Sequence, residues 1–254
     1  MTAPAEPKSG RGWELAAVLA VTYAASGLYA LLELVRAELT VRGGIAATTA
    51  RIVYVQPTTH PWLDFADRLA DLLTGFAPAL LALALLARDP GGRGAGIGLE
   101  RLRRARDWLQ GLGFCALIGV PGLALVYVAH RLGYNASIAA VTFPDLWYRI
   151  PYLLLRALNS GMGEEIVVCA YLLTRLRQLR VPAVPALLIE STLRGSYHLY
   201  QGYGGFAGNF VMGLIFGYWF QRTGRVVPLV VAHTLLDAIS FIGYVYLHGH
   251  VSWI

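Results

Sequence analysis

The chain has 254 residues, of which 56% are hydrophobic and 14% are charged, and its mean hydropathy is +0.53. A soluble domain carries about 25% charged residues, so this composition excludes a water-soluble globular protein. The net charge of +6 comes almost entirely from Arg. Because these Arg lie mostly in short segments between apolar runs, they indicate membrane topology and contact with anionic lipids, and not nucleic-acid binding.

The N-terminal segment is polar and contains Pro, and no small-residue cleavage site precedes a short apolar stretch. Residues 1–12 are therefore predicted to be a disordered lead and not a signal peptide. Residues 13–254 are predicted to form a single membrane-embedded helical domain, because the sequence has no internal repeat and no sign of a second domain. Cys115 and Cys169 lie within apolar runs and do not indicate a disulfide framework.

Apolar runs recur along the chain, and each is close to the roughly 20 residues that a helix needs to cross a bilayer. We therefore predict an all-α fold, a polytopic transmembrane helix bundle with about seven spans. The predicted spans cover residues 15–35, 69–87, 109–130, 150–173, 184–200, 206–220 and 227–247.

Basic residues flank the predicted spans mainly on one side. Lys8 and Arg11 precede the first span, and further Arg follow the second, fourth and sixth spans. With seven spans all of these groups share one side, which the positive-inside rule makes cytoplasmic. The sequence thus predicts an integral protein of the plasma (inner) membrane with a cytoplasmic N-terminus. The lipid bilayer is its predicted environment.

Ionisable side chains lie inside three of the predicted spans, where each costs roughly 2.5–3.5 kcal/mol on insertion scales and marks function by default. The residues concerned are Glu164 and Glu165 in the fourth span, Arg194 and His198 in the fifth, and His233 and Asp237 in the seventh. Because hydrocarbon satisfies none of these groups, we expect them to meet and satisfy one another. The alternative is structural ion pairing that only holds the bundle together.

Spacing limits how these side chains can meet. The two residues in the fifth span are four apart, as are the two in the seventh, so each pair shares one helix face. Glu164 and Glu165 are adjacent and differ in direction by about 100°, so one is expected to face a common centre while the other finds its own partner. Gly161 and Gly163 precede them, either for helix packing or for the close approach of a bound peptide.

The order of these residues is similar to a known pattern, which has Glu-Glu-x-x-x-Arg on one helix, Phe-x-x-x-His on the next and a later His-x-x-x-Asn/Asp. This chain supplies, in the same order and on separate spans, Glu164-Glu165, His198, His233 and Asp237. Over residues 145–245 it resembles the CPBP family of intramembrane proteases. That family includes the type II CAAX prenyl endopeptidases and the bacteriocin-processing and immunity (ABI) proteins, so residues 145–245 are expected to form the protease-like core.

The resemblance implies an intramembrane endopeptidase that hydrolyses a peptide bond of a membrane-associated protein or peptide. Peptide hydrolysis needs an activated water and a group that stabilises the oxyanion. By resemblance, Glu164 would activate the water and His198 would help to hold it. Glu165 would orient its neighbours or pair with Arg194, and His233 would face the oxyanion.

Asp237 stands where the pattern has Asn or Asp. An ionised Asp cannot donate a hydrogen bond to an oxyanion, so Asp237 either stays protonated or, as we prefer, orients His233 through an imidazole N–H. A divalent metal such as zinc is the alternative, with Glu164, His198, His233 and Asp237 as its ligands. The resemblance extends to metalloproteases and to metal-independent glutamate proteases, and we do not predict an obligatory metal.

Two positions depart from the family pattern. Cys169 stands where the pattern has Arg, and Arg194 stands where it has Phe. We hypothesise a swap in which Arg194 supplies the positive charge that Cys169 cannot. Without such compensation, the chain would be a catalytically impaired family member that acts as a membrane-binding or immunity protein. A proton-coupled transporter is a third possibility, because Glu/His/Asp relays also lie at mid-membrane, but the two related halves usual in transporters are absent.

Overall fold

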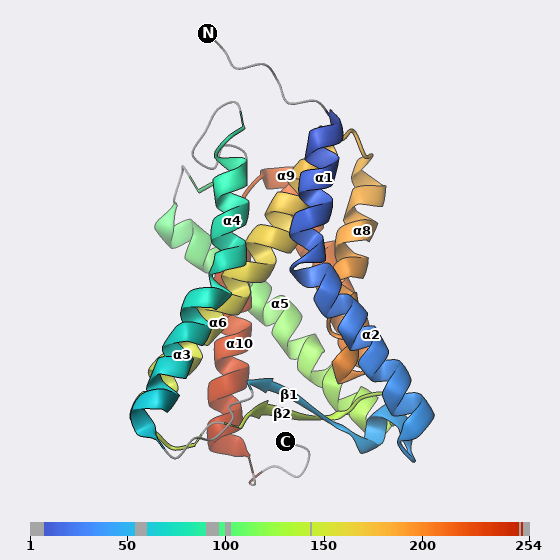
Figure 1. The fold of residues 1–254 in the computed structure, drawn as a ribbon, viewed down its shortest axis with the longest axis vertical. Coiled ribbons are helices and arrows are strands. Elements are labelled where there is room, and N and C mark those ends of the chain that lie inside the picture. The colour runs from blue at the N-terminus through green and yellow to red at the C-terminus, as the bar shows by residue number, and fades with distance from the viewer. Residues whose placement is uncertain are drawn as a thin grey trace.

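The structure is a computed structural model that describes residues 8–53, 60–89, 97–99, 103–142, 144–248 and 250. Helices make up most of this part of the chain, and a small sheet lies at one end of the helix bundle (Figure 1). The predicted all-α helix bundle is confirmed, and the sheet is an addition that the sequence analysis did not predict.

The N-terminal half forms helices that break at identifiable residues. These helices are α1 (Lys8–Ala20), α2 (Tyr23–Thr40), α3 (Pro61–Gly75), α4 (Ala77–Leu86) and α5 (Arg104–Arg131). α1 and α2 are bent by 45° at a short break. There the Thr22 hydroxyl donates a hydrogen bond to the Val18 carbonyl at 2.6 Å, a contact with residue i−4 that bends helices. α3 gives way to α4 at Gly75 and Phe76, just before Pro78, whose ring is compatible only with the first turn of a helix.

The C-terminal half contains the helices that carry the candidate site. They are α6 (Arg149–Gly163), the π-helix η2 (Glu164–Tyr171), α7 (Leu172–Gln178), α8 (Ala183–Ser196), the 3₁₀ turn η3 (Leu199–Gln201), α9 (Tyr203–Thr223) and α10 (Val227–Leu247). α6, η2 and α7 follow one another without a break in helical backbone conformation. Gly224, with φ +64°, ends α9 in the left-handed conformation that favours Gly. α8 packs along α9, and α10 packs along both α5 and α6.

The sheet joins two sides of the bundle. β1 (Thr49–Val53), which follows the 3₁₀ turn η1 (Gly44–Ala47), pairs in parallel with β2 (Ser137–Val141). Ala50 of β1 packs in a cluster with residues of α2 and next to residues of η3, whereas Val53 packs with residues of α6 and α10. The strands therefore link the α2 side of the molecule to the α6 and α10 side.

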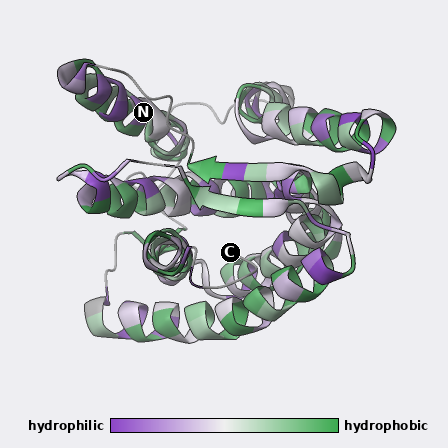
Figure 2. Cartoon of the chain, turned by 90° about the horizontal axis from the view of Figure 1, so that it is seen from below, coloured by the Kyte–Doolittle hydropathy of each residue, from purple (hydrophilic) through white to green (hydrophobic). Residues whose placement is uncertain are grey.

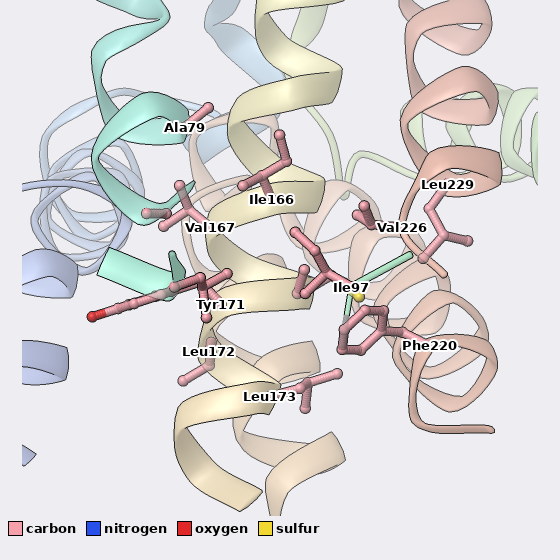
Figure 3. Packing of buried hydrophobic residues seen from close by; sticks show 14 of the residues in the cluster. Ala79, Ile97, Ile166, Val167, Tyr171, Leu172, Leu173, Phe220, Val226 and Leu229 are labelled. Atoms are coloured by element: carbon pink, nitrogen blue, oxygen red, sulfur yellow. The ribbon is translucent and has the colours of Figure 1, made fainter. Parts of the chain in front are cut away.

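The largest apolar core surrounds η2 and α7. In Figure 3, Val167 and Tyr171 of η2 point to the side where Ala79 of α4 lies, and Phe220 of α9 lies on the opposite side, next to Ile97. Ile97, which comes from the segment before α5, is fully buried among them, and its carbonyl accepts a hydrogen bond from the Val226 backbone at 3.0 Å. This close packing holds η2 in a fixed position relative to α9 and α10.

Many large apolar side chains of the helices are exposed, as a lipid-facing surface requires. Hydrophobic residues recur along the helices (Figure 2). Three helical segments, Pro61–Leu86, Ala105–Arg131 and Val227–Leu247, are long and apolar enough to cross a membrane, and the bent pair α1–α2 makes a fourth. The predicted count of about seven spans is therefore not confirmed. α8, for example, has 14 residues, and at 1.5 Å per residue its length of about 21 Å is less than the roughly 30 Å hydrocarbon core.

The first helix begins within the predicted N-terminal lead. α1 begins at Lys8, so residues 8–12 of the predicted lead 1–12 are helical, whereas residues 1–7 lie outside the described part of the chain. The helical start places the Glu14 side chain, one turn further along, against α7.

The basic ends of several helices meet at one end of the bundle through a buried ion-pair network. Arg175 of α7 is 2% exposed, and its Nε donates to Glu14 of α1 at 2.8 Å while its Nη1 donates to Asp89, which follows α4, at 2.6 Å. The Tyr171 hydroxyl donates to the same Glu14 oxygen at 2.8 Å. The start of α1 and the ends of α4 and α7 thus lie together. The sequence analysis predicted that the basic residues next to these helix ends lie on one side of the membrane, and this arrangement agrees with it.

We predict that Arg175→Leu destabilises the protein. The substitution leaves Glu14 and Asp89 without their buried counter-charge, and breaking a buried pair from one side costs about 3–5 kcal/mol. Thermal unfolding of the purified protein in detergent should show a clear fall in Tm. The matched control is Arg177→Leu, because Arg177 is exposed on the same helix; if both variants melt alike, the network does not stabilise the fold.

Candidate active site

Glu164 and Glu165 lie where α6 passes into η2. Their exposed fractions are 8% and 0%, and π-helical segments such as η2 occur frequently at functional sites. Both carboxylates reach the same atom: Nη1 of Arg194 is 2.8 Å from Oε1 of Glu165 and 3.5 Å from Oε2 of Glu164. The two carboxylates nevertheless have different main partners, as expected for adjacent residues: Glu165 makes the short contacts to Arg194, whereas Oε2 of Glu164 faces the Tyr197 hydroxyl.

Glu165 connects three helices. It accepts two hydrogen bonds from Arg194 of α8, at 2.8 Å and 3.0 Å. Its Oε1 is also 2.7 Å from Nδ1 of His233 of α10. The predicted pairing of Glu165 with Arg194 is present, and because Glu165 and Arg194 are fully buried, the contact links η2, α8 and α10 inside the bundle.

Glu164 has a different environment. Its Oε2 accepts a hydrogen bond from the Tyr197 hydroxyl at 2.8 Å. The same oxygen is 3.7 Å from Nε2 of His198 and 4.0 Å from Nε2 of His233. The two imidazoles therefore face the carboxylate oxygen at distances that are too long for direct hydrogen bonds.

His198 presents an unsatisfied nitrogen to this space. Its Nε2 is buried and makes no hydrogen bond with any residue in the described ranges. Its Nδ1 is 3.3 Å from the Gln201 amide nitrogen, and since an amide N–H can only donate, Nδ1 is the acceptor and Nε2 carries the proton. A buried polar atom without a partner is costly, so this nitrogen indicates a place for water or substrate.

The structure corrects the predicted contact of Asp237. Its Oδ2 is 3.8 Å from Nε2 of His233, which is beyond hydrogen-bonding distance, and it lies beside Ser160 of α6. The group that orients the His233 ring is Glu165, at Nδ1. The sequence could not distinguish these partners, because an i,i+4 spacing permits a contact without requiring one.

Two site residues were missed by the sequence analysis. Glu190 of α8 is fully buried, and its Oε1 accepts a hydrogen bond from Nε of Arg194 at 3.1 Å. It could have been found, because it is an ionisable residue within the predicted span 184–200. Tyr197, the hydrogen-bond donor to Glu164, carries no charge and gave no comparable signal.

The site holds an excess of acidic groups. Glu164, Glu165 and Glu190 surround the guanidinium of Arg194, the only Arg that contacts these three carboxylates in the described part of the chain. Three buried negative charges cannot be balanced by one positive charge. Protonated imidazole or protonated carboxyl groups must therefore supply the balance.

Cys169 lies next to the buried guanidinium. Its side chain is fully buried, and the charged groups that act on it are Glu190, Glu165 and Arg194. The Arg194 side chain enters from the neighbouring helix, and its Cζ lies over the Phe216 ring, 5.9 Å from the ring centroid. This arrangement agrees with the hypothesis that the positive charge has moved from position 169 to position 194.

The residues suggested as metal ligands do not form a metal site in this arrangement. Within the described ranges, no group of three or more His, Cys, Asp or Glu side chains has the geometry to hold a metal ion. Oε2 of Glu164 accepts a hydrogen bond from Tyr197 and lies 3.5 Å from the cationic Arg194. Oδ2 of Asp237 and Oε2 of Glu164 are 3.8 Å and 4.0 Å from Nε2 of His233, which is longer than a shared metal ion would require. We therefore derive no chemical step through a metal.

Comparison with known proteins adds one finding. Residues 145–239 match the family model described as type II CAAX prenyl endopeptidase Rce1-like. No curated protein and no solved structure matches the chain. The matched segment contains all of the acidic and histidine residues of the site, and the match supports membership of the CPBP family.

We predict that Arg194→Leu destabilises the protein by about 3–5 kcal/mol, the usual loss when one partner of a buried ion pair is removed. Three carboxylates would lose their shared counter-ion. The swap hypothesis adds that Cys169→Arg should restore part of this loss when it is combined with Arg194→Phe, because a guanidinium at position 169 can reach the same carboxylates.

Thermal unfolding of the wild type, the Arg194→Leu and Arg194→Phe single variants and the Cys169→Arg/Arg194→Phe double variant measures both effects. A normal Tm for Arg194→Leu would show that the cluster does not need this charge. A double variant no more stable than Arg194→Phe would refute the swap while leaving the role of Arg194 intact.

Proposed function

From its membership of the CPBP family, we propose that this chain is an intramembrane endopeptidase that hydrolyses a peptide bond of a membrane-associated protein or peptide. The observation that carries the proposal is the arrangement around Glu164. Its Oε2 faces Nε2 of both His198 and His233, at 3.7 Å and 4.0 Å, inside a helix bundle with apolar outer faces. This combination of an acid–base carboxylate with two imidazoles is suited to activating a water.

In the proposed reaction, a water lies between Glu164 and Nε2 of His198. Glu164 takes one proton as the water oxygen forms a bond to the scissile carbonyl carbon, and the carbonyl π electrons move to the oxygen. Collapse of this tetrahedral intermediate breaks the C–N bond, and the proton on Glu164 passes to the leaving amine. All of these groups come from helix η2 and from the residues at the end of α8, which hold them in place.

His233 is proposed to stabilise the oxyanion. Because Glu165 binds Nδ1 at 2.7 Å, Nε2 is the nitrogen that is directed toward Glu164, and a protonated ring would donate from there. Asp237, 3.8 Å from the same Nε2, would favour the charged ring through its field and not through a direct hydrogen bond. Arg194 and Glu190 are proposed to fix Glu165 and so to act indirectly.

The substrate class follows from the family name and from the bilayer. Type II CAAX prenyl endopeptidases act on prenylated CAAX proteins, and a related membrane-anchored peptide is proposed for this chain. The basic helix ends that meet near Arg175 would lie in the cytoplasm by the positive-inside rule. The N-terminus would then be cytoplasmic and the protein would lie in the plasma (inner) membrane.

A catalytically impaired family member that binds a membrane partner or confers immunity is the second candidate. The observation that favours it is the tight pairing of Arg194 with Glu165 and its approach to Glu164 at 3.5 Å. Such pairing can stabilise a bundle without any catalysis. The two candidates differ in whether any peptide bond is broken.

We predict that membranes containing the wild-type chain yield peptide termini that are absent with Glu164→Gln. The substitution keeps the shape of the side chain and removes the base, and loss of a general base reduces a rate by about 10²–10⁴-fold. Mass spectrometry of the new termini measures the difference, and a quenched prenylated CAAX peptide serves as a directed probe. Glu38→Gln is the control, because Glu38 is exposed on α2. Identical termini in all three samples would favour the binding function.

We also predict that cleavage survives removal of divalent metals by a chelator. Tyr197 and Arg194 occupy the surroundings of Glu164 Oε2, and a cation beside a guanidinium is disfavoured. Metal analysis of purified wild type and His198→Ala provides the second measurement. One zinc per chain in the wild type that is lost in the variant, with loss of cleavage on chelation, would contradict the prediction.

A further inference from the structure

Tyr23 brings the N-terminal helices into the site. It is the first residue of α2, directly after the break that follows α1. Its ring centroid is 5.0 Å from that of Tyr197, at an interplanar angle of 47°, and Tyr197 is the residue that donates to Glu164. Tyr23 lies outside the segment 145–239 that matches the family, so no motif in that segment points to it.

The Tyr23 hydroxyl lies against the backbone next to the proposed base. A Cβ atom added to Gly163 would be 2.5 Å from the Tyr23 hydroxyl oxygen and 3.9 Å from its Cζ. Gly163 immediately precedes Glu164. By contrast, a Cβ atom added to Gly161 would be 2.6 Å from the hydroxyl of Thr234 on α10, which is helix packing. Of these two Gly residues, only Gly163 lies against the Tyr23 hydroxyl, next to the proposed catalytic Glu164.

This hydroxyl has no assigned partner within the protein. Tyr197 is engaged with Glu164, whereas the Tyr23 hydroxyl makes no hydrogen bond with any residue that the structure describes. Tyr23 is half-buried, and its hydroxyl is a hydrogen-bond donor that lies beside the residue preceding the proposed base and is not used by the described part of the protein. This donor is therefore free to bind substrate.

We propose that the Tyr23 hydroxyl donates a hydrogen bond to the carbonyl oxygen of the scissile peptide bond as it becomes an oxyanion. The inference rests on the peptidase function proposed above. In this scheme Glu164 takes the proton of the attacking water while Tyr23 and His233 stabilise the negative oxygen. Tyr23 gives up no proton and returns to its starting state when the C–N bond breaks.

The two residues Tyr23 and Gly163 allow a test by paired substitution. Tyr23→Phe removes the hydroxyl and retains the ring. Gly163→Ala retains Tyr23 but places a methyl group where the hydroxyl lies, so it should displace the same donor. In the Tyr23→Phe background that methyl group meets only the ring carbon at 3.9 Å, an ordinary van der Waals contact. The effects of the two substitutions on catalysis should therefore not add.

The experiment uses the full chain in detergent or in proteoliposomes. Its probe is a quenched fluorogenic peptide whose sequence is taken from a cleavage that requires Glu164 in membranes. Loss of one oxyanion donor lowers kcat by about 10²-fold, with KM unchanged because ground-state binding is retained. We expect this loss in Tyr23→Phe, in Gly163→Ala and, without further loss, in the double variant. Tyr29→Phe, whose ring is 71% exposed on the same helix, should be normal.

The outcomes separate this inference from the proposed function. If no cleavage requires Glu164, the peptidase proposal falls and the role of Tyr23 falls with it. If Glu164-dependent cleavage is present and Tyr23→Phe retains the wild-type kcat, only the role of Tyr23 is overturned. Losses that multiply in the double variant, or that accompany a lower Tm, would show packing and not oxyanion binding. Should Tyr23→Phe not yield folded protein, Gly163→Ala alone tests the same hydroxyl, because Ala favours the helix.

Discussion

The arrangement of the site depends on one buried guanidinium. Arg194 is fully buried on α8 and contacts Glu164, Glu165 and Glu190. In a bundle whose outer faces are apolar, none of these carboxylates could remain ionised without a nearby positive charge. The guanidinium suits the task because its planar fork can bind several oxygens at once. It fixes Glu165, and Glu165 in turn fixes His233, so the position of one imidazole is set by an ion pair on two other helices.

Close helix packing makes this contact possible. A Cβ atom added to Gly195 would be 2.9 Å from the Phe206 ring, and one added to Gly213 would be 2.8 Å from the Ser191 backbone. Small residues at these positions bring α8 and α9 close together, as is usual between membrane helices. The same approach encloses Glu190 and Arg194 between α8 and α9. The ion pair of Glu190 and Arg194 thus depends on the close packing of the apolar helices around it.

Much of the site could be predicted from single ionisable residues inside apolar runs, because hydrocarbon forces such residues together. Glu165, Arg194 and His233 meet as that reasoning requires. The pairing of Glu165 with Arg194 was also predicted, but the partner of His233 was not: Glu165 and not Asp237 binds its Nδ1, because a spacing of four residues permits a contact without requiring one. The sheet was missed because β1 and β2 are short, and each is separated from its partner by three helices. The number of spans could not be predicted from hydropathy either. An apolar run does not reveal where its helix breaks, as at Thr22, or that a helix such as α8 is too short to cross the bilayer.

The match to the family covers residues 145–239, yet the fold needs the preceding helices to complete this segment. Arg175 lies within the matched segment, but its partners Glu14 and Asp89 do not. The same holds near Glu164, where Gly163 belongs to the matched segment and the hydroxyl that occupies the space above it belongs to α2. The helices outside the matched segment therefore do more than anchor it. They supply the counter-charges at one end and, at the break between α1 and α2, a polar group beside the proposed base. Differences between family members in these helices can thus alter the site while the motif residues stay the same.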